Sequence, residues 1–367
     1  MRLREFWVQV HLWLGLTLGI LGVFIGLSGS ILVFDREIDG MLNAQRHRTS
    51  EGPAELAYSE YVKRATAALE GKARPMLVRA SEGESEPIVV TARSNEEGGG
   101  FSRVYLDPPT GRVLDIAVGG GFIGWVHNFH ESLTLRDLHG REIVGAVGIA
   151  MLISSLTGVY LWWPGRARFA ASLGFRRGLP LSRNLHYVGG FYGFIVLAML
   201  SFTGIFIAYA DAGRVVVSLF GPLSPPARNV SIEEGSVGKQ RLSIDEAIAI
   251  AKKAYPDESL WSVGLPAGPK GTYRVNLSEP GLDSPQPARG TVVFIDPRDG
   301  SIVRRVDAKT RTSGDQFLAM QRAMHGGDPF GRAGRLLICI VGLLPGLLVV
   351  TGSIMWLRKW RAHVART

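Results

Sequence analysis

The sequence predicts an α-helical membrane bundle with four transmembrane helices, joined to two small α+β domains outside the membrane and built by internal duplication. Three observations lead to this fold class. First, 46% of the 367 residues are hydrophobic, and the mean hydropathy lies slightly above zero, which is high for a water-soluble chain. Second, four long stretches contain no charged residue. Third, the two halves of the chain carry the same motifs at constant offsets.

The four uncharged stretches are the predicted membrane spans. Each is long enough to cross a hydrocarbon core, which needs about 20 apolar residues, and a soluble core seldom sustains four such runs. The spans are Phe6–Phe34, Ile143–Gly165, Asn184–Ala210 and Leu336–Leu357. The first span begins like a signal peptide, but its apolar run is too long and no A-x-A site follows, so we expect an uncleaved anchor.

The basic residues predict the orientation of the spans. The net charge is +9, and the excess is concentrated in three short segments at 1–10, 164–185 and 358–367. All three lie on the same side of the predicted membrane, so the positive-inside rule places them in the cytoplasm. Because the rest of the chain is close to neutral, a nucleic-acid-binding surface is not expected.

These spans divide the chain into eight segments. They are transmembrane helix 1 (1–35), a first external domain (36–121), a histidine segment with transmembrane helix 2 (122–165), a cytoplasmic loop (166–183), transmembrane helix 3 (184–210), a second external domain (211–318), a second histidine segment with transmembrane helix 4 (319–357), and a cytoplasmic tail (358–367).

Each external segment predicts a small α+β domain. An amphipathic helix is expected over about 59–70, and a second begins at a capping box with Ser243 and Glu246. Three or four strands follow each helix. In both segments an apolar strand runs into an Asp-Pro-x-x-Gly turn, beginning at Asp107 and at Asp296.

The spans themselves repeat. His11 in span one is followed after 17 positions by Ser28-Gly29, and His186 in span three is followed at the same distance by Thr203-Gly204. Spans two and four align at an offset of 194, which matches Thr157-Gly158 with Thr351-Gly352. An ionisable group inside a span is costly and usually functional, so the repeated histidines are candidate ligands.

Two histidine pairs follow from the repeat. His11 and His186 lie near the cytoplasmic ends of their spans, while His130 and His325 precede spans two and four at the outer side. His127 lies three residues before His130 and is the alternative outer ligand, although the offset favours His130. The remaining histidines, His47, His139 and His363, are interpreted as solvated surface residues.

Paired histidines in a membrane indicate two b-type haems, each with two axial imidazoles. The chain has one cysteine, Cys339, so covalent haem attachment through Cys-x-x-Cys-His and all-cysteine iron–sulfur ligation are excluded. Zinc would need three or four close ligands. Glycines near the histidines, such as Gly15 and Gly190, are typical of close helix packing and would also leave room for a flat macrocycle.

Two arginines are equivalent in the repeat and lie at the outer membrane edge. Arg141 and Arg335 could each pair with a haem propionate, because a guanidinium suits a carboxylate. Anchoring at the interface is the alternative interpretation.

The chain resembles the PepSY-associated transmembrane proteins, or iron-regulated membrane proteins, which include bacterial inner-membrane ferric-siderophore reductases. The resemblance covers nearly the whole chain and rests on the two Asp-Pro-x-x-Gly turns and on five further motifs: His11-Leu-Trp-Leu-Gly15, Phe129-His130-Glu-Ser-Leu, Thr157-Gly158-Val-Tyr-Leu-Trp-Trp-Pro164, Leu185-His186-Tyr-Val-Gly-Gly and Met324-His325-Gly. It implies four helices, two haems and two periplasmic PepSY-type domains.

The expected function is a haem-dependent ferric-siderophore reductase of the bacterial inner membrane. Electrons would come from a cytoplasmic donor or the quinol pool, and ferric siderophore in the periplasm would be reduced to release Fe(II). Besides these partners only membrane lipid is expected, and no catalytic acid, base or nucleophile is required. The alternatives are a non-redox permease for iron complexes and a PepSY-type interaction protein that restrains periplasmic peptidases.

Overall fold

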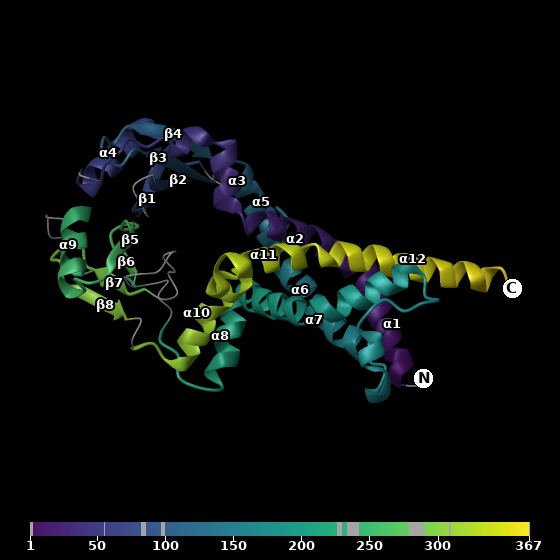
Figure 1. The fold of residues 1–367 in the computed structure, drawn as a ribbon. Helices are drawn as coiled ribbons and strands as arrows, with labels where there is room; N and C mark the ends of the chain where they lie inside the picture. The colour runs from purple at the N-terminus through teal and green to yellow at the C-terminus, as the bar shows by residue number, and fades with distance from the viewer. Residues whose placement is uncertain are drawn as a thin grey trace. The chain divides into compact units, whose positions relative to one another are not determined.

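The computed structural model describes residues 3–54, 56–81, 86–96, 100–225, 230–232, 242–278, 290–307 and 310–366. The chain divides into two compact units, a helical unit and a sheet unit (Figure 1). The helical unit contains Met1–Asp35, Trp125–Leu219 and Met320–Thr367, and the sheet unit contains Arg36–Gly124 and Phe220–Ala319.

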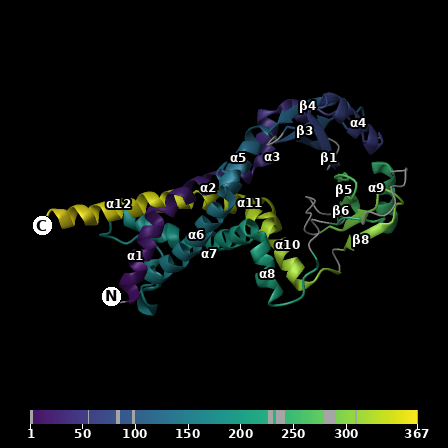
Figure 2. The same ribbon diagram turned by 180° about the vertical axis from the view of Figure 1, so that it is seen from behind.

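The helical unit holds the predicted spans. Its helices are α1 (Leu3–Leu16), α2 (Leu18–Leu32), α5 (Gly121–Ser132, mostly in this unit), α6 (Gly140–Trp162), α7 (Leu181–Ala208), α8 (Ala210–Ser218), the end of α10 (Ser313–Gly326), α11 (Gly331–Gly342) and α12 (Leu344–Val364). Among the described residues, three helical stretches are long and apolar enough to cross a membrane. If the bent pair of α1 and α2 is counted as one span, there are up to four. Both chain ends lie at the same end of this unit (Figure 2).

Two of the expected spans are interrupted. The first is bent by 53° between α1 and α2, where the hydroxyl of Thr17 donates a 2.7 Å hydrogen bond to the carbonyl of Trp13. Gly15 and Gly19 flank this position, and small or hydroxyl residues of this kind are frequent at helix kinks. The fourth span divides at Leu343, just before Pro345 in the first turn of α12, where proline is tolerated.

The ends of the helices fix which segments share one end of the bundle. Arg4, near the start of α1, donates a 3.1 Å hydrogen bond to the carbonyl of Leu161, at the end of α6. The helix α7 packs against both α6 and α12. The start of α1 and the connection from α6 to α7 therefore lie at the same end of the helical unit.

The sheet unit is an eight-stranded antiparallel sheet with two helices packed on its core face. Its strands are β1 (Ala73–Arg79), β2 (Ile88–Ser94), β3 (Phe101–Leu106), β4 (Val113–Val118), β5 (Ser259–Gly264), β6 (Tyr273–Ser278), β7 (Val292–Ile295) and β8 (Ile302–Val306), in the order β4-β3-β2-β1-β5-β6-β7-β8. The helices of this unit are α3 (Asp35–Leu42), α4 (Tyr58–Ala68) and α9 (Ile244–Ala254).

The two external segments form a single sheet rather than two separate domains. Strand β1 pairs with β5, so that Val78 lies opposite Val263. The backbone N–H of Tyr58, at the start of α4, donates a 2.6 Å hydrogen bond to Asp245 in α9. Edge strands β1 and β5 would otherwise expose unpaired backbone groups, so pairing them satisfies both edges.

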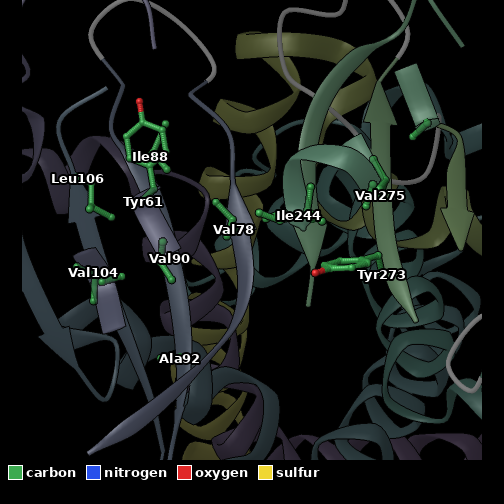
Figure 3. Close-up of a cluster of buried hydrophobic side chains, with 14 of the residues drawn as sticks. Tyr61, Val78, Ile88, Val90, Ala92, Val104, Leu106, Ile244, Tyr273 and Val275 are labelled. Carbon is green, nitrogen blue, oxygen red and sulfur yellow. The ribbon is translucent and has the colours of Figure 1, made fainter. Parts of the chain in front are cut away.

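The core of the sheet unit lies between the sheet and the helices α4 and α9. Alternate strand residues such as Val90, Val104 and Val275 are fully buried against Tyr61 of α4 and Ile244 of α9 (Figure 3). Burying an aliphatic side chain of this size contributes about 1.5–3 kcal/mol. The predicted capping box is confirmed, because Ser243 and Glu246 cap α9 reciprocally.

The predicted Asp-Pro-x-x-Gly turns are present at both positions. The N–H of Gly111 donates to the carbonyl of Asp107 over 2.8 Å, and the N–H of Gly300 donates to that of Asp296 over 3.0 Å. Both glycines adopt a positive φ, at 65° and 78°, a conformation that glycine reaches without strain.

Candidate functional site

The helical unit brings the four predicted histidines together as two pairs. His11 from α1 faces His186 from α7, with the ring centroids 6.2 Å apart and the ring planes nearly perpendicular. His130 from α5 faces His325 from α10, also with a centroid distance of 6.2 Å. The pairing predicted from the repeat is thus the pairing that the structure has.

The two pairs lie at different levels of the bundle. Helix α7 carries His186 near its start, and 17 residues later it carries Thr203, which contacts His325. At 1.5 Å per residue this separation corresponds to about 25 Å along the helix axis. The pairs are therefore separated by a distance close to the thickness of a hydrocarbon core, which is about 30 Å.

Each of the four imidazoles contacts a hydroxyl on a neighbouring helix through its Nδ1 atom. The four distances are His11 to Thr157 3.1 Å, His130 to Ser28 3.1 Å, His186 to Thr351 3.0 Å, and His325 to Thr203 2.8 Å. Two of these imidazoles also contact a backbone carbonyl through Nδ1, His130 that of Ile25 and His186 that of Leu348. The same arrangement thus occurs four times.

The hydroxyls determine which ring nitrogen carries the proton. Each hydroxyl already donates its own hydrogen to a carbonyl four residues earlier in its helix, for example Thr157 to Ile153 over 2.7 Å and Thr351 to Leu347 over 2.6 Å. Ser28 and Thr203 do the same. A hydroxyl that has used its hydrogen can only accept, so Nδ1 must donate. In the neutral ring, Nε2 then holds the free lone pair.

A glycine follows each hydroxyl and gives the imidazole room. A Cβ atom added at Gly158 or Gly352 would lie 3.3 Å from Cε1 of His11 or His186, and one added at Gly29 would lie 2.9 Å from Cε1 of His130. Gly204 is placed in the same way against His325. We call the four hydroxyl–glycine dipeptides Ser28-Gly29, Thr157-Gly158, Thr203-Gly204 and Thr351-Gly352 the histidine cradles.

Sequence reasoning noted these dipeptides as repeat markers but did not assign them to the histidines. Their constant offsets were the available signal. Other glycines near the histidines lie at close contacts between helices, as helix packing predicts. A Cβ at Gly26 would lie 2.3 Å from the carbonyl oxygen of Gly342, and one at Gly193 would lie 2.3 Å from Leu344. A Cβ added at Gly15 would meet no atom of another helix within 4 Å.

The donor set fits two six-coordinate haems. Metal–imidazole bonds of about 2.0 Å, with each nitrogen about 1.1 Å from its ring centroid, place two axial rings about 6 Å apart. This matches both pairs. Ligating histidines also usually donate the other ring N–H to a protein acceptor, as all four do here. Among the described residues no group of three or more His, Cys, Asp or Glu side chains is gathered as a site for a metal ion.

The alternative ligand His127 lies apart from this site. Its side chain is about half exposed and contacts Glu131 over 3.1 Å, and the hydrogen bond from His127 lowers the pKa of Glu131 to about 2. His130 therefore occupies the position that faces His325.

Arg141 and Arg335 both bind backbone carbonyls at helix ends. Arg141 donates to the carbonyls of Ile207 and Ala208 at the end of α7, and Arg335 donates to that of Val33 at the end of α2. Cations stabilise helix C-termini, where carbonyls lack partners. Each arginine thus caps a helix that carries a cradle for the pair His130 and His325.

Of the histidines interpreted as solvated, His139 and His363 are exposed, but His47 is not fully so. Its Nε2 atom is buried and has no hydrogen-bond partner among the described residues. Its ring lies against Gly40 of α3, so packing of the sheet unit accounts for the difference.

The long apolar helices together with the sheet unit define a multi-pass membrane protein. The model of the PepSY-associated TM region family matches residues 8–359, and the chain belongs to that family. It is thus a membrane protein of the iron-regulated membrane protein type. No curated protein matches the chain.

Proposed function

We propose that this protein is a di-haem reductase of the bacterial inner membrane that delivers electrons to ferric siderophore in the periplasm. The observation that carries the proposal is the pair of matched histidine sites, each with a centroid distance of 6.2 Å and with Nδ1 bonded to a hydroxyl. Helices that only anchored the sheet unit in the membrane would not need two histidine pairs, each held by hydroxyl–glycine dipeptides, at two depths of the bundle.

In this proposal His11 and His186 hold the inner haem b, and His130 and His325 hold the outer one. A haem between two imidazoles supplies one-electron chemistry without an open coordination position. The histidines ligate through Nε2, the cradles fix the ring tautomer, and the apolar helices exclude water. Electrons come from a cytoplasmic donor or from quinol, one quinol reducing two ferric ions and releasing two protons.

The product of the proposed reaction explains its use. Fe(II) binds hard oxygen ligands more weakly than Fe(III) does, so a tight ferric chelate loses its metal when it is reduced. No acid, base or nucleophile of the protein takes part. Both chain ends and the segment 166–183 are cytoplasmic in the proposed orientation, and the sheet unit is periplasmic.

The proposal is tested first by haem content. Protein expressed with ample haem should show a b-type spectrum after dithionite reduction and two extractable haems per chain in a pyridine haemochrome assay. His186→Ala and His325→Ala should each lose one haem, and a different one. His139→Ala is the matched control, because this histidine is exposed, and it should keep both haems.

The reaction is tested by stopped-flow reoxidation. Reduced protein should be reoxidised by ferric siderophore while Fe(II) appears in a chromogenic trap, and His325→Ala should slow this reaction strongly. Protein without haem, or reduced protein that no ferric chelate reoxidises faster than oxygen alone does, would contradict the proposal.

A further inference from the structure

The charged residues in the eight strands of the sheet unit are almost all positive. They contain seven arginines, which are Arg74, Arg79, Arg93, Arg103, Arg274, Arg304 and Arg305, and no lysine. The single carboxylate within the strands is Asp115 in β4. Asp115 is already neutralised, because Arg46 donates to it over 2.6 Å.

The strand register places most of these arginines on one face. Val78, Val90 and Val263 belong to the core beneath α4 and α9, and side chains alternate between faces along a strand. Arg79, next to Val78, pairs with Val89 and Ser262, on the face away from the core.

The same alternation applies to the neighbouring strands. Arg103 pairs with Thr91, and Arg274 pairs with Gly264. Arg74 and Arg93 pair with each other on this face. We call Arg74, Arg79, Arg93, Arg103 and Arg274 the arginine face.

The arginine face has unneutralised charge. Arg74, Arg93, Arg103 and Arg274 are exposed and Arg79 is partly exposed. Within the described ranges no ion pair joins Arg79, Arg93, Arg103 or Arg274 to a carboxylate, and Arg74 donates to the carbonyl of Pro266. Like charges on adjacent strands repel, so an anionic ligand would stabilise this face.

Two of these arginines lie on either side of small residues in β5. Strand β5 lies between Arg79 on β1 and Arg274 on β6, and its residues in register with these two arginines are Ser262 and Gly264. A Cβ at Gly264 would meet nothing closer than 3.4 Å, and that contact is with Arg274. Two arginines therefore flank two small residues of β5, Ser262 and Gly264.

We propose that the arginine face binds the substrate and selects anionic ferric chelates, those whose iron is held by carboxylates or catecholates and which carry net negative charge. Arginine suits such ligands because its planar fork pairs two N–H groups with two oxygens. Chelates without net negative charge, as with many hydroxamates, lack the charge that this face attracts. The inference rests on the proposed function for its substrate, and it adds the substrate class.

The experiment measures binding to the full-length protein with gallium(III) complexes, which have the shape of the ferric complexes but are not reduced under these conditions. The anionic probe is a gallium tris-catecholate, and the cationic probe is gallium desferrioxamine B. The variants are Arg103→Gln and Arg274→Gln. The control is Arg305→Gln, since this arginine lies on the same sheet but pairs with the core residue Val293.

We expect the anionic probe to bind and the cationic probe not to bind. Each face variant should weaken binding about tenfold or more, as for loss of a charged hydrogen bond, and Arg305→Gln should leave it unchanged. Added salt should weaken binding of the anionic probe. Equal binding of both probes, or unchanged affinity in both face variants, would overturn the inference.

Two further outcomes separate this inference from the proposed function. If the protein binds the chelate but contains no haem, the binding role of the arginine face is supported and the reductase function is refuted. If the protein reduces both ferric chelates through haem and the arginine variants have no effect, the reductase function is supported and the binding role of the arginine face is refuted. If short-chain phosphatidylglycerol displaces the anionic probe from wild-type protein and phosphatidylcholine does not, the arginines bind membrane phosphate, and the chelate assignment is wrong.

Discussion

At the scale of single residues, the histidine cradles are the most informative feature of this protein. A buried imidazole could carry its proton on either nitrogen, and only one tautomer leaves Nε2 free to ligate. Thr157 resolves this for His11, because its hydroxyl donates to Ile153 and can only accept from Nδ1. In the proposed haem site, Thr157 would thus determine which nitrogen of His11 is free to ligate the iron without contacting the haem itself.

We therefore expect Thr157→Val, which keeps the shape but removes the hydroxyl, to weaken binding of the inner haem about 10–100-fold and to shift its reduction potential. Thr157→Ser should restore both properties. The measurements are haem titration and a redox titration of the inner and outer haem bands.

Ser201→Ala is the control for this prediction, because that hydroxyl also donates to a carbonyl of its own helix, Leu197, but lies at no histidine. An equal effect of Ser201→Ala and Thr157→Val would show that lost helix stability, not the tautomer, is responsible.

At the scale of elements, close packing between helices sets the positions of the cradles. Helix α2 carries Ser28-Gly29 and approaches α11 so closely that Gly26 faces the carbonyl of Gly342. The hydroxyl of Ser30 in α2 donates a 2.8 Å hydrogen bond to the carbonyl of Cys339 in α11. Small residues allow this approach between membrane helices.

Gly26→Ala should lower the free energy of unfolding by about 1–3 kcal/mol, as overpacked sites do, because a Cβ would lie 2.3 Å from a backbone oxygen. Gly346→Ala is the control, since its Cβ would make an ordinary 3.6 Å contact with Val23. Thermal denaturation in detergent measures both. Equal stability of the two variants would show that α2 and α11 separate at little cost.

The turn after β7 gives a prediction about pH. Arg298 donates a 2.7 Å ion-pair hydrogen bond to buried Asp296, and this bond holds the pKa of the Asp296 carboxyl below its usual value. A lowered pKa stabilises the fold above the ordinary pKa of aspartate, and the contribution is lost as the pH falls through the lowered value.

Asp296→Asn should therefore destabilise the protein at neutral pH by about 1–3 kcal/mol, and the difference from wild type should shrink below about pH 3. Denaturant unfolding at both pH values measures it. Asp257→Asn, at an exposed position, should have no effect at either pH. A difference that is the same at both pH values would mean that the carboxylate charge is not involved.

At the scale of the whole molecule, the two halves of the chain are joined within each unit. In the sheet unit, β1 pairs with β5, and in the helical unit each histidine pair takes one ligand from each half, as His11 and His186 show. Neither half alone holds a complete pair. The halves must therefore fold together for either site to form.

The proposed orientation of the molecule rests on its three basic segments. Fusions of green fluorescent protein at the C-terminus and within residues 166–178 should fluoresce, while alkaline phosphatase inserted after Gly221 should be active, because that enzyme matures only in the periplasm. Replacing Arg358, Lys359 and Arg361 by Gln should reduce the fluorescence of the C-terminal fusion. Active phosphatase at the C-terminus of the unaltered chain would reverse the proposed orientation.

The sequence by itself determined the long apolar segments, the turns, the capping box at Ser243 and the histidine pairs, because hydropathy, glycine conformation and repeat offsets are local or periodic properties. Only the tertiary structure could decide the rest. The choice of His130 over His127 depends on which side chain meets His325 across helices. The cradles depend on helix contacts between residues over 100 positions apart, and the joining of two domains into one sheet depends on backbone pairing that no side-chain pattern records.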